Sequence, residues 1–518
     1  MDRDLQDLVK TTTRGSLILL VGQISSTLIL AVGILIVARI LGPTSFGSLN
    51  KAQSVVQIAI LLMNFGVQQA MVKYLAQFHH EGKDDFIRVF IEAGIIINLV
   101  ISAIFTVLVY ILSGFIANDV FNEPEQELFI KFLSLSIIGQ SFSTLAQGIT
   151  VGYERMELRS LISIAYSFIK SIISPILVYI GFGTLGAILG HTSPILLSGA
   201  LGTVFIVIIY RSQKPEARPI SHLQAIRTIL TYGFPLYLAS LLSGLLPQIY
   251  TTLLGIWETN EKIGNYSVAL NFSVLLSFVT LPISTTIFPL FSKLKKDQNE
   301  LGFLYRNGVK YSTLFGYPII FTVLALADQI IQVLFKARYV YASYYLRIYM
   351  LSFLLIGFGS VCNNSLLSGQ DRNDVNFKST LGKFIVSLPL SYYAIQVYGV
   401  VGLLYIFFIT GAVNTGINLF YIRRIFGFKI NLRFLAKMLV ISLVSCFLVY
   451  EVFKVVSVNP WIELFAGGML SVFIYFIGVL ILKVFSKQDF TYFRELTQSF
   501  GLLSPVIRWL IDMLIKYS

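Results

Sequence analysis

The sequence predicts an all-α membrane protein that crosses the bilayer about fourteen times. Of its 518 residues, 56% are hydrophobic and only 13% are charged, and the mean hydropathy is +0.78. A soluble protein of this length is far less apolar. Apolar runs of about 20 residues or more, the length that a helix needs to cross a bilayer, recur along the whole chain. Short polar connections separate these runs, so the composition and its periodicity predict the same architecture.

The apolar runs define the expected membrane spans. The first run is too long for the core of a signal peptide and lacks a small-residue cleavage site, so we expect it to remain as an uncleaved span. The predicted spans lie near residues 15–41, 50–75, 87–117, 127–152, 159–181, 184–210, 227–256, 263–291, 307–335, 342–368, 377–397, 400–422, 432–456 and 460–483.

The distribution of basic residues predicts the orientation in the membrane. The formal net charge is +13, and about 30 of the 39 Lys and Arg residues fall on one face if residues 1–14 are cytoplasmic. We therefore expect a multi-pass protein of the cell membrane with both termini in the cytoplasm. Basic loops of this kind contact membrane lipids rather than nucleic acid. The tail, residues 486–518, is predicted to be an amphipathic helix on the cytoplasmic leaflet.

Several classes of enzyme lack support in the sequence. No connection exceeds about twenty residues, which leaves no room for a soluble catalytic domain. The chain contains no GxxxxGK[ST], HExxH or GxSxG motif. Its two cysteines, Cys362 and Cys446, lie in different apolar runs, so they predict neither a disulfide framework nor a metal site. We therefore predict a protein that is not an enzyme and has no catalytic residues and no cofactor.

An internal repeat divides the chain. The segment FGSLNKA (46–52) matches IGNYSVA (263–269), and VGYERME (151–157) matches SGQDRND (368–374), both at a spacing of about 217 residues. GTLGA (183–187) and GVVGL (399–403) both mark the outer turn of a predicted helical hairpin. Because separate pairs of segments match at nearly the same spacing, the sequence predicts two related halves of six spans each.

The repeat predicts the domain organisation. A cytoplasmic segment at 1–14 precedes a first lobe at 15–210, and a linker at 211–226 leads to a second lobe at 227–424. Residues 425–485 then supply the thirteenth and fourteenth spans. In secondary transporters such halves enclose a substrate site near the middle of the membrane. The repeat therefore predicts a transporter.

Basic residues within or beside the spans are the candidate substrate contacts. A charge inside a span costs about 3 kcal/mol unless it meets water or a partner. Lys170 is expected roughly 18 Å into the bilayer, and Lys383 occupies the related place in the second repeat. Arg39 and Lys51 flank a Gly-Pro turn at the predicted outer face, and Arg347 lies on the tenth span. The alternative for all five is a structural role, as interfacial anchors or as partners of carbonyl and carboxylate groups.

Two further residues are candidates for ion coupling. Glu92 lies inside the third span, where a pair with Arg88 four residues earlier is the ordinary interpretation. His191 lies in the sixth span, where a hydrogen bond is the ordinary interpretation. Because cations outnumber carboxylates among these positions, the sequence favours an anionic substrate such as a phosphate over an organic cation.

The chain resembles the polysaccharide transporter family of oligosaccharide flippases, in the superfamily that also contains the multidrug extruders and the lipid II flippases. The resemblance is carried by VARILGPTSFG (37–47), ADQIIQVLFKARYVYASYYLRIYMLSF (327–353) and NNSLLSGQDRN (363–373). It implies a fold like that of the multidrug extruders and lipid II flippases, with two six-helix lobes, two added helices and a central cationic cavity. It also implies Arg39, Lys170, Arg347 and Lys383 as headgroup contacts or structural anchors.

The resemblance also implies a function. The substrate would be a polyprenyl-diphosphate-linked oligosaccharide, turned from the cytoplasmic to the outer leaflet by alternating access, with Na⁺ or H⁺ coupling and glycan-assembly enzymes as expected partners. Lipid II flippases carry an Arg-Asp pair where this chain has Gly33 and Ile34, which favours a different glycan. A multidrug antiporter and a lipid II flippase remain the alternatives.

Overall fold

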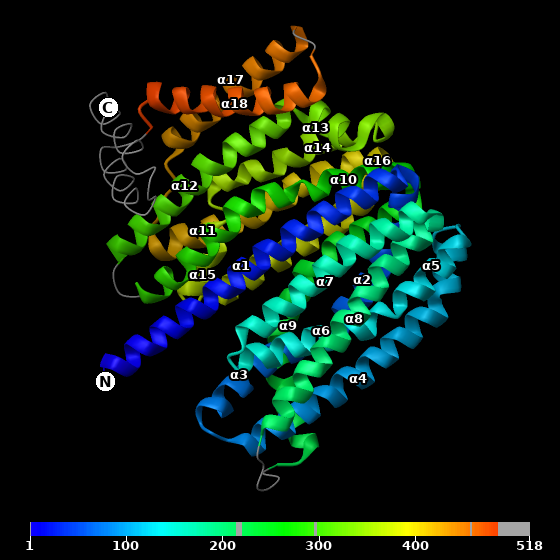
Figure 1. Ribbon diagram of the computed structural model, residues 1–518. Coiled ribbons are helices and arrows are strands. Elements are labelled where there is room, and N and C mark those ends of the chain that lie inside the picture. The colour runs from blue at the N-terminus through cyan, green and yellow to red at the C-terminus, as the bar shows by residue number, and fades with distance from the viewer. Residues whose placement is uncertain (1, 214–219, 295–297, 456–457, 485–518) are drawn as a thin grey trace. The chain divides into compact units, whose positions relative to one another are not determined.

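The computed structural model describes residues 2–213, 220–294, 298–455 and 458–484 (Figure 1). These residues form helices joined by short turns, and no strand occurs among them. The α-helices are α1 (Asp2–Leu41), α2 (Pro43–Leu62), α3 (Val67–His80), α4 (Asp84–Phe115), α5 (Glu125–Ser134), α6 (Ser136–Gly152), α7 (Met156–Leu177), α8 (Gly183–Ser212), α9 (His222–Trp257), α10 (Asn260–Asn271), α11 (Ser273–Lys293), α12 (Gln298–Ala325), α13 (Ala327–Phe335), α14 (Ala342–Leu351), α15 (Cys362–Gly369), α16 (Asn373–Phe426), α17 (Leu432–Val455) and α18 (Pro460–Ile481). Short 3₁₀ or π segments are η1 (Ile116–Val120), η2 (Val178–Phe182), η3 (Lys336–Arg338) and η4 (Ser352–Phe358).

The predicted all-α, multi-pass architecture is confirmed. Eight helices among the described residues are long and apolar enough to cross a membrane, and four bent pairs of helices raise this number to as many as twelve. Two of the eight, Met156–Ser212 and Asn373–Phe426, have 57 and 54 residues, whereas one crossing takes about 20. The count of fourteen spans stays a prediction, as does the amphipathic tail, which lies outside the described residues.

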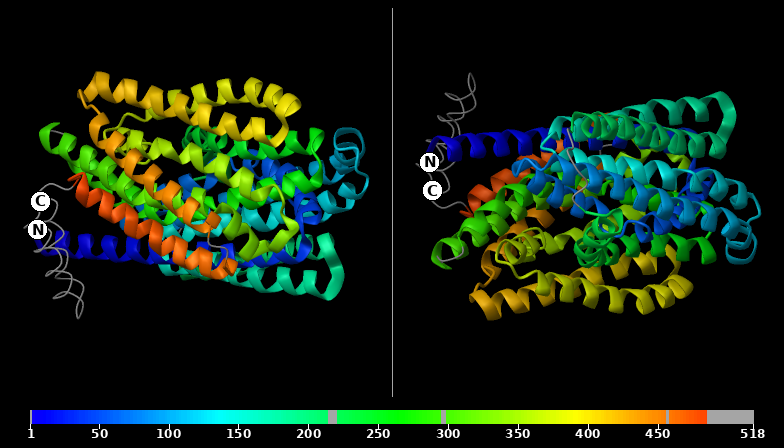
Figure 2. Two further views of the ribbon diagram at one scale, coloured as in Figure 1. Left: turned by 90° about the horizontal axis from the view of Figure 1, so that it is seen from above. Right: turned by 90° about the horizontal axis from the view of Figure 1, so that it is seen from below.

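The backbone repeats where the sequence repeats. The chain reverses between α7 and α8, which run side by side in both views of Figure 2. At this reversal Gly183 has φ 52° and ψ −135°, and Gly399, its counterpart in α16, has φ 60° and ψ −141°. Glu154 and Asp371, which are 217 residues apart, have φ values of 58° and 57°. Positive φ is uncommon for residues with a side chain, so this shared conformation supports the sequence alignment of the two halves.

The described residues pack as two compact units. The first contains those among residues 1–274, 337–345 and 380–410, and the second those among 275–336, 346–379 and 411–518. The predicted lobes at 15–210 and 227–424 follow the sequence repeat, and that division stays a prediction. Helices α9 and α10, which begin the second sequence repeat, pack within the first unit against α2, α3 and α4.

Each unit has its own apolar core, with small polar residues at close helix contacts. In the first unit, Leu75, Ile87 and Ile149 are fully buried between α3, α4 and α6. The hydroxyls of Ser26 and Ser167 lie 2.6 Å apart where α1 crosses α7. Small residues allow such close approach between membrane helices.

In the second unit α12 packs against α17 and α18. The Tyr475 hydroxyl donates to the Leu314 carbonyl at 2.8 Å, which ties α18 to α12. Large apolar side chains on the outer faces of the helices are exposed, as lipid-facing residues are expected to be.

Candidate functional site

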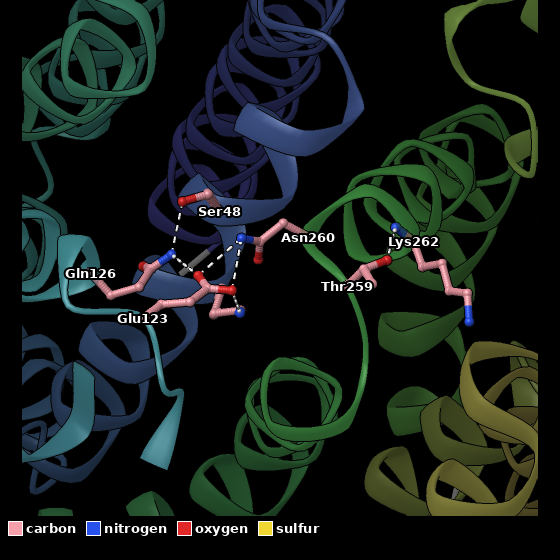
Figure 3. Close-up of polar contacts among 7 residues, drawn as sticks. Ser48, Glu123, Gln126, Thr259, Asn260 and Lys262 are labelled. Atoms are coloured by element: carbon pink, nitrogen blue, oxygen red, sulfur yellow. Dashed lines mark hydrogen bonds and ion pairs between the residues drawn. The ribbon is translucent and has the colours of Figure 1, made fainter. Parts of the chain in front are cut away.

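A cluster of polar side chains joins the start of α2, the turn before α5 and the start of α10 (Figure 3). Glu123 is its centre. The Lys51 ammonium lies 2.9 Å from Glu123 Oε1, and the Asn260 amide donates to both carboxylate oxygens at 3.0 and 2.9 Å. Gln126 donates to Glu123 Oε2 at 3.1 Å and to the Ser48 hydroxyl at 2.8 Å. We call these five residues, Ser48, Lys51, Glu123, Gln126 and Asn260, the Glu123 cluster.

Residues at the starts of α2 and α10 determine where the side chains of the Glu123 cluster lie. Pro43 at the first position of α2 suits a helix start because its missing N–H would have no helical partner there. Thr259 caps α10, with its hydroxyl accepting a hydrogen bond from the Lys262 amide (Figure 3). The cap fixes where α10 begins and therefore where Asn260 points.

The buried ammonium of Lys51 in this cluster is stabilised by the carboxylate of Glu123. Lys51 is 1% exposed, whereas Glu123 is 28% exposed. Burial favours the neutral carboxyl, but the hydrogen bonds from Asn260, Lys51 and Gln126 outweigh burial and hold the pKa of Glu123 below its ordinary value. Removing one member of a buried ion pair leaves the other charge uncompensated.

We expect Lys51→Met and Glu123→Gln to be coupled. Methionine keeps an apolar stem where the Lys51 side chain packs near Gly255, so the substitution removes mainly the charge. Each single change should lower the free energy of unfolding by about 3 kcal/mol, and the double change by less than the sum. Thermal unfolding of the four proteins in one detergent measures this coupling, and additive effects would contradict it.

The contribution of the Lys51–Glu123 pair to stability should depend on pH, and the lowered pKa of Glu123 gives the direction. Because the folded-state pKa of Glu123 is lowered, its contribution to stability is full above the unfolded pKa of about 4.3 and is lost as the pH falls through the folded value. We therefore expect the coupling between Lys51 and Glu123 to be constant between about pH 6 and 8 and to weaken only in acid.

Two glycines bring α2 and α10 into backbone contact beside the Glu123 cluster. A Cβ on Gly47 would lie 1.7 Å from the Asn260 carbonyl oxygen, and a Cβ on Gly264 would lie 1.9 Å from the Pro43 carbonyl oxygen. Gly264 follows Gly47 by 217 residues, and Asn260 follows Pro43 by the same number. The two repeats therefore meet at equivalent positions, each presenting a glycine to the backbone of the other.

A second polar site lies inside the first unit, where α1, α2, α7, α8 and α10 surround a cavity of about 80 Å³. Lys170 on α7 and His191 on α8 face each other in it, with the lysine Nζ 2.8 Å from His191 Nδ1. Lys170 also donates to the Tyr166 hydroxyl at 3.2 Å. A charged lysine has only donors, so a charged Lys170 requires His191 Nδ1 to be the acceptor of this contact.

The Lys170 cavity is basic and amide-rich. Its polar lining consists of Asn50, Gln53, Lys170, Ser171, Ser174, His191 and Asn271, and no Asp or Glu occurs among the described residues that line it. Amide donors and a lysine suit an anion. Drug-sized ligands usually occupy cavities of roughly 300–1,000 Å³, so this conformation holds at most a small group there.

The sequence singled out Lys170 and His191 separately, and the structure brings them together. Glu92 lies elsewhere, on α4 where α8 and α9 meet it. The Glu92 carboxylate accepts a hydrogen bond from the Tyr210 hydroxyl and lies near His222 Nε2, both at 2.6 Å. Arg88 is 3.5 Å from the same carboxylate, as the spacing of four residues predicted. Glu92 thus ties three helices together at one end of the first unit.

The remaining predicted contacts are dispersed. Arg39 is exposed in the last turn of α1. Arg347 forms an ion pair with Asp328 at 2.6 Å within the second unit. Lys383 is half-buried on α16 in the first unit, without a hydrogen bond or ion pair to any described residue. Their roles as substrate contacts stay predictions.

Sequence reasoning missed Glu123, Asn260 and the amides of the Lys170 cavity. Glu123 is 72 residues from Lys51, and the turn that carries it resembles an ordinary solvated loop. The one available signal was the FGSLNKA repeat, whose glycines mark the contact at which the cluster forms.

Comparisons with known proteins agree with this architecture. A family model described as "Polysaccharide biosynthesis protein" matches residues 36–344, more than half of the chain. The chain is 23% identical over 470 residues to the probable low-salt glycan biosynthesis flippase Agl15 of Haloferax volcanii, covering 89% of this chain and 94% of that protein. It is 24% identical over 409 residues to the lipopolysaccharide biosynthesis protein WzxC of Escherichia coli, covering 77% and 78%.

Solved structures share the fold. The lipid II flippase MurJ in an inward closed conformation matches with a TM-score of 0.70 at 15% identity, covering 90% of this chain and 98% of that one. An inward-facing multidrug transporter of the MATE family in the MOP superfamily matches with a TM-score of 0.62 at 17% identity, covering 78% and 94%. The resemblance inferred from the sequence is confirmed, and the chain belongs to the polysaccharide biosynthesis protein family.

Proposed function

We propose that this protein is a flippase that moves a polyprenyl-diphosphate-linked oligosaccharide from the cytoplasmic to the outer leaflet of the cell membrane by alternating access. The single observation that carries this proposal is the Lys170 cavity. A lysine and several amides line a cavity inside a helical bundle, without an acidic residue among its described lining. The names of the two relatives, a probable glycan biosynthesis flippase and a lipopolysaccharide biosynthesis protein, support the same class of substrate.

The proposed role of the Lys170 cavity is to receive phosphate oxygens. Inside the bilayer, the ammonium and the amide donors of Asn50, Gln53 and Asn271 would replace part of the water lost by the headgroup. Since the cavity is only about 80 Å³, the sugar must occupy space that opens beside it during the cycle. The polyprenyl chain would stay in lipid.

The Glu123 cluster is the proposed outer closure. It joins α2 of the first repeat to Asn260 of the second at the end predicted to face outward. Release of the headgroup to the outer leaflet would require these hydrogen bonds and the glycine contact beside them to separate. Arg39, at the end of α1, is proposed to meet the headgroup as it leaves.

We retain coupling to Na⁺ or H⁺ as the proposed energy source. His191 is the better placed of the two candidate residues, because it contacts Lys170 directly, whereas Glu92 is held by Tyr210 and His222. We also propose that both termini lie in the cytoplasm and that the protein contacts enzymes of glycan assembly.

Proteoliposomes test this function. Vesicles containing a polyprenyl-diphosphate oligosaccharide would be assayed for its exposure to a membrane-impermeant lectin, with and without the protein. Protein-dependent exposure supports the proposal. Gradient-driven efflux of an organic cation, with no exposure of any such lipid, would instead assign the protein to the multidrug antiporters.

A further inference from the structure

The second unit has a strongly basic pocket that none of the predicted site residues occupies. Its volume is about 350 Å³. The pocket lies at the start of α12, in the turn between α16 and α17, and just beyond the end of α18. Its charged lining consists of Arg306, Lys310, Lys429, Arg433, Lys437 and Lys483.

Among the described residues that line the pocket, all the charged side chains are cationic. Six cations surround it, and no Asp or Glu occurs among its described lining residues, although the chain has 26 acidic residues. A concave surface lined by one sign of charge concentrates counter-ions. Arginine also binds phosphate through paired hydrogen bonds, which lysine does not do. The pocket therefore fits a ligand with several negative oxygens.

Contacts between helices tie the walls of the pocket together. The Lys437 ammonium donates to the Leu482 carbonyl at 2.8 Å, which joins the first turns of α17 to the end of α18. Tyr305 on α12 is buried beneath the pocket, and its hydroxyl donates to Asn363 Oδ1 at 2.8 Å. The pocket is thus built on the helical core rather than on a loop alone.

The surroundings of the pocket favour a lipid over a soluble phosphate. Tyr305, Val309, Ile430, Phe434 and Val484 give it an apolar side. Farther along α17, beginning one turn beyond Lys437, a row of exposed apolar side chains continues into the predicted membrane span: Val440, Leu443, Val444 and Phe447. A lipid would place its headgroup among the cations and its chains along this row.

We propose that this pocket binds the phosphate or diphosphate headgroup of a membrane lipid. The source is either an anionic phospholipid, which carries a phosphodiester, or a polyprenyl diphosphate, since both present negatively charged phosphate oxygens at the membrane surface. The assignment rests on the pocket itself and is independent of whether the protein flips lipids.

The test compares Lys429→Gln/Arg433→Gln with wild type and with a matched control, Arg423→Gln/Arg424→Gln. The control removes two exposed cations from the end of α16 that do not line the pocket. Full-length protein in neutral detergent would be titrated with phosphatidylglycerol, a polyprenyl diphosphate and inorganic pyrophosphate, with binding measured by microscale thermophoresis. We expect the pocket variant to bind its preferred lipid roughly tenfold more weakly or worse, and the control to match wild type.

The three probes distinguish a phospholipid, a polyprenyl diphosphate and a soluble phosphate as the ligand. Tighter binding of one lipid identifies it as the ligand, and inorganic pyrophosphate, which has no lipid chain, should bind more weakly than that lipid. Equal affinity of wild type and pocket variant would overturn the site, and pyrophosphate binding as tightly as both lipids would overturn its assignment to a lipid. Arg306→Gln, on α12, provides a second variant if the first does not fold. Binding is measured without transport, so a negative binding result would overturn the pocket proposal but not the flippase proposal. A negative flipping assay would likewise leave the pocket proposal standing.

Discussion

Replacing Gly264 by leucine is expected to separate α2 from α10 and to lower the stability of the folded protein more than any surface substitution. A Cβ at this position would lie 1.9 Å from the Pro43 carbonyl oxygen, a backbone atom that cannot move aside as a side chain can. Overpacking of a well-packed site costs about 1–3 kcal/mol and sometimes more, and this contact belongs to the upper end. The midpoint of thermal unfolding in detergent should fall by several degrees.

Gly47→Leu should have a similar effect, because Gly47 makes the equivalent contact with Asn260. The two substitutions disturb one helix crossing, so the double variant should lose less stability than the sum of the single losses. Gly468→Leu on α18 is the matched control, since a Cβ there meets nothing within 4 Å. A Gly264→Leu protein as stable as this control would show that the two helices do not touch as described.

Lys170→Ala is expected to reduce the flipping rate by roughly ten- to a hundredfold, since a hydrogen bond to a charged group contributes about 1.5–3 kcal/mol. Lys170→Arg should retain part of the activity because it keeps the charge. Lys131→Ala provides the control: this lysine pairs with Glu127 on α5 and does not line the cavity. The initial rate of lectin accessibility in proteoliposomes measures all three.

Thermal unfolding of the same variants separates a functional loss from a structural one. Lys170 contacts His191 and Tyr166, so its removal leaves two polar groups without one partner, and some loss of stability is expected. A slow but stably folded Lys170→Ala protein would support the proposed contact with phosphate. Unchanged flipping in that variant would refute it.

The sequence predicted the architecture because its signals are local or strictly repeated. Apolar run length predicted the helices, and the register of about 217 residues located Gly47 and Gly264 at the same place in their repeats. Their reciprocal contact was not predictable, since a repeat states which positions are equivalent and not which positions touch.

Pairing between distant residues was the main information that the sequence lacked. The pair of Arg88 and Glu92 follows from helical spacing, but the contacts of Glu92 with Tyr210 and His222 depend on how α4, α8 and α9 pack. The ion pair of Arg347 on α14 with Asp328 on α13 depends on packing in the same way, although the Asp328 side chain is 57% exposed.

The measurement that tests the central claim most directly is the flipping rate of one oligosaccharide on two lipids. Wild-type proteoliposomes would contain the glycan attached either to a polyprenyl diphosphate or to a neutral lipid of similar length. If cations such as Lys170 recognise the headgroup, the diphosphate-linked glycan should be flipped at least about tenfold faster. Equal rates for the two lipids, or faster movement of the neutral one, would contradict the account.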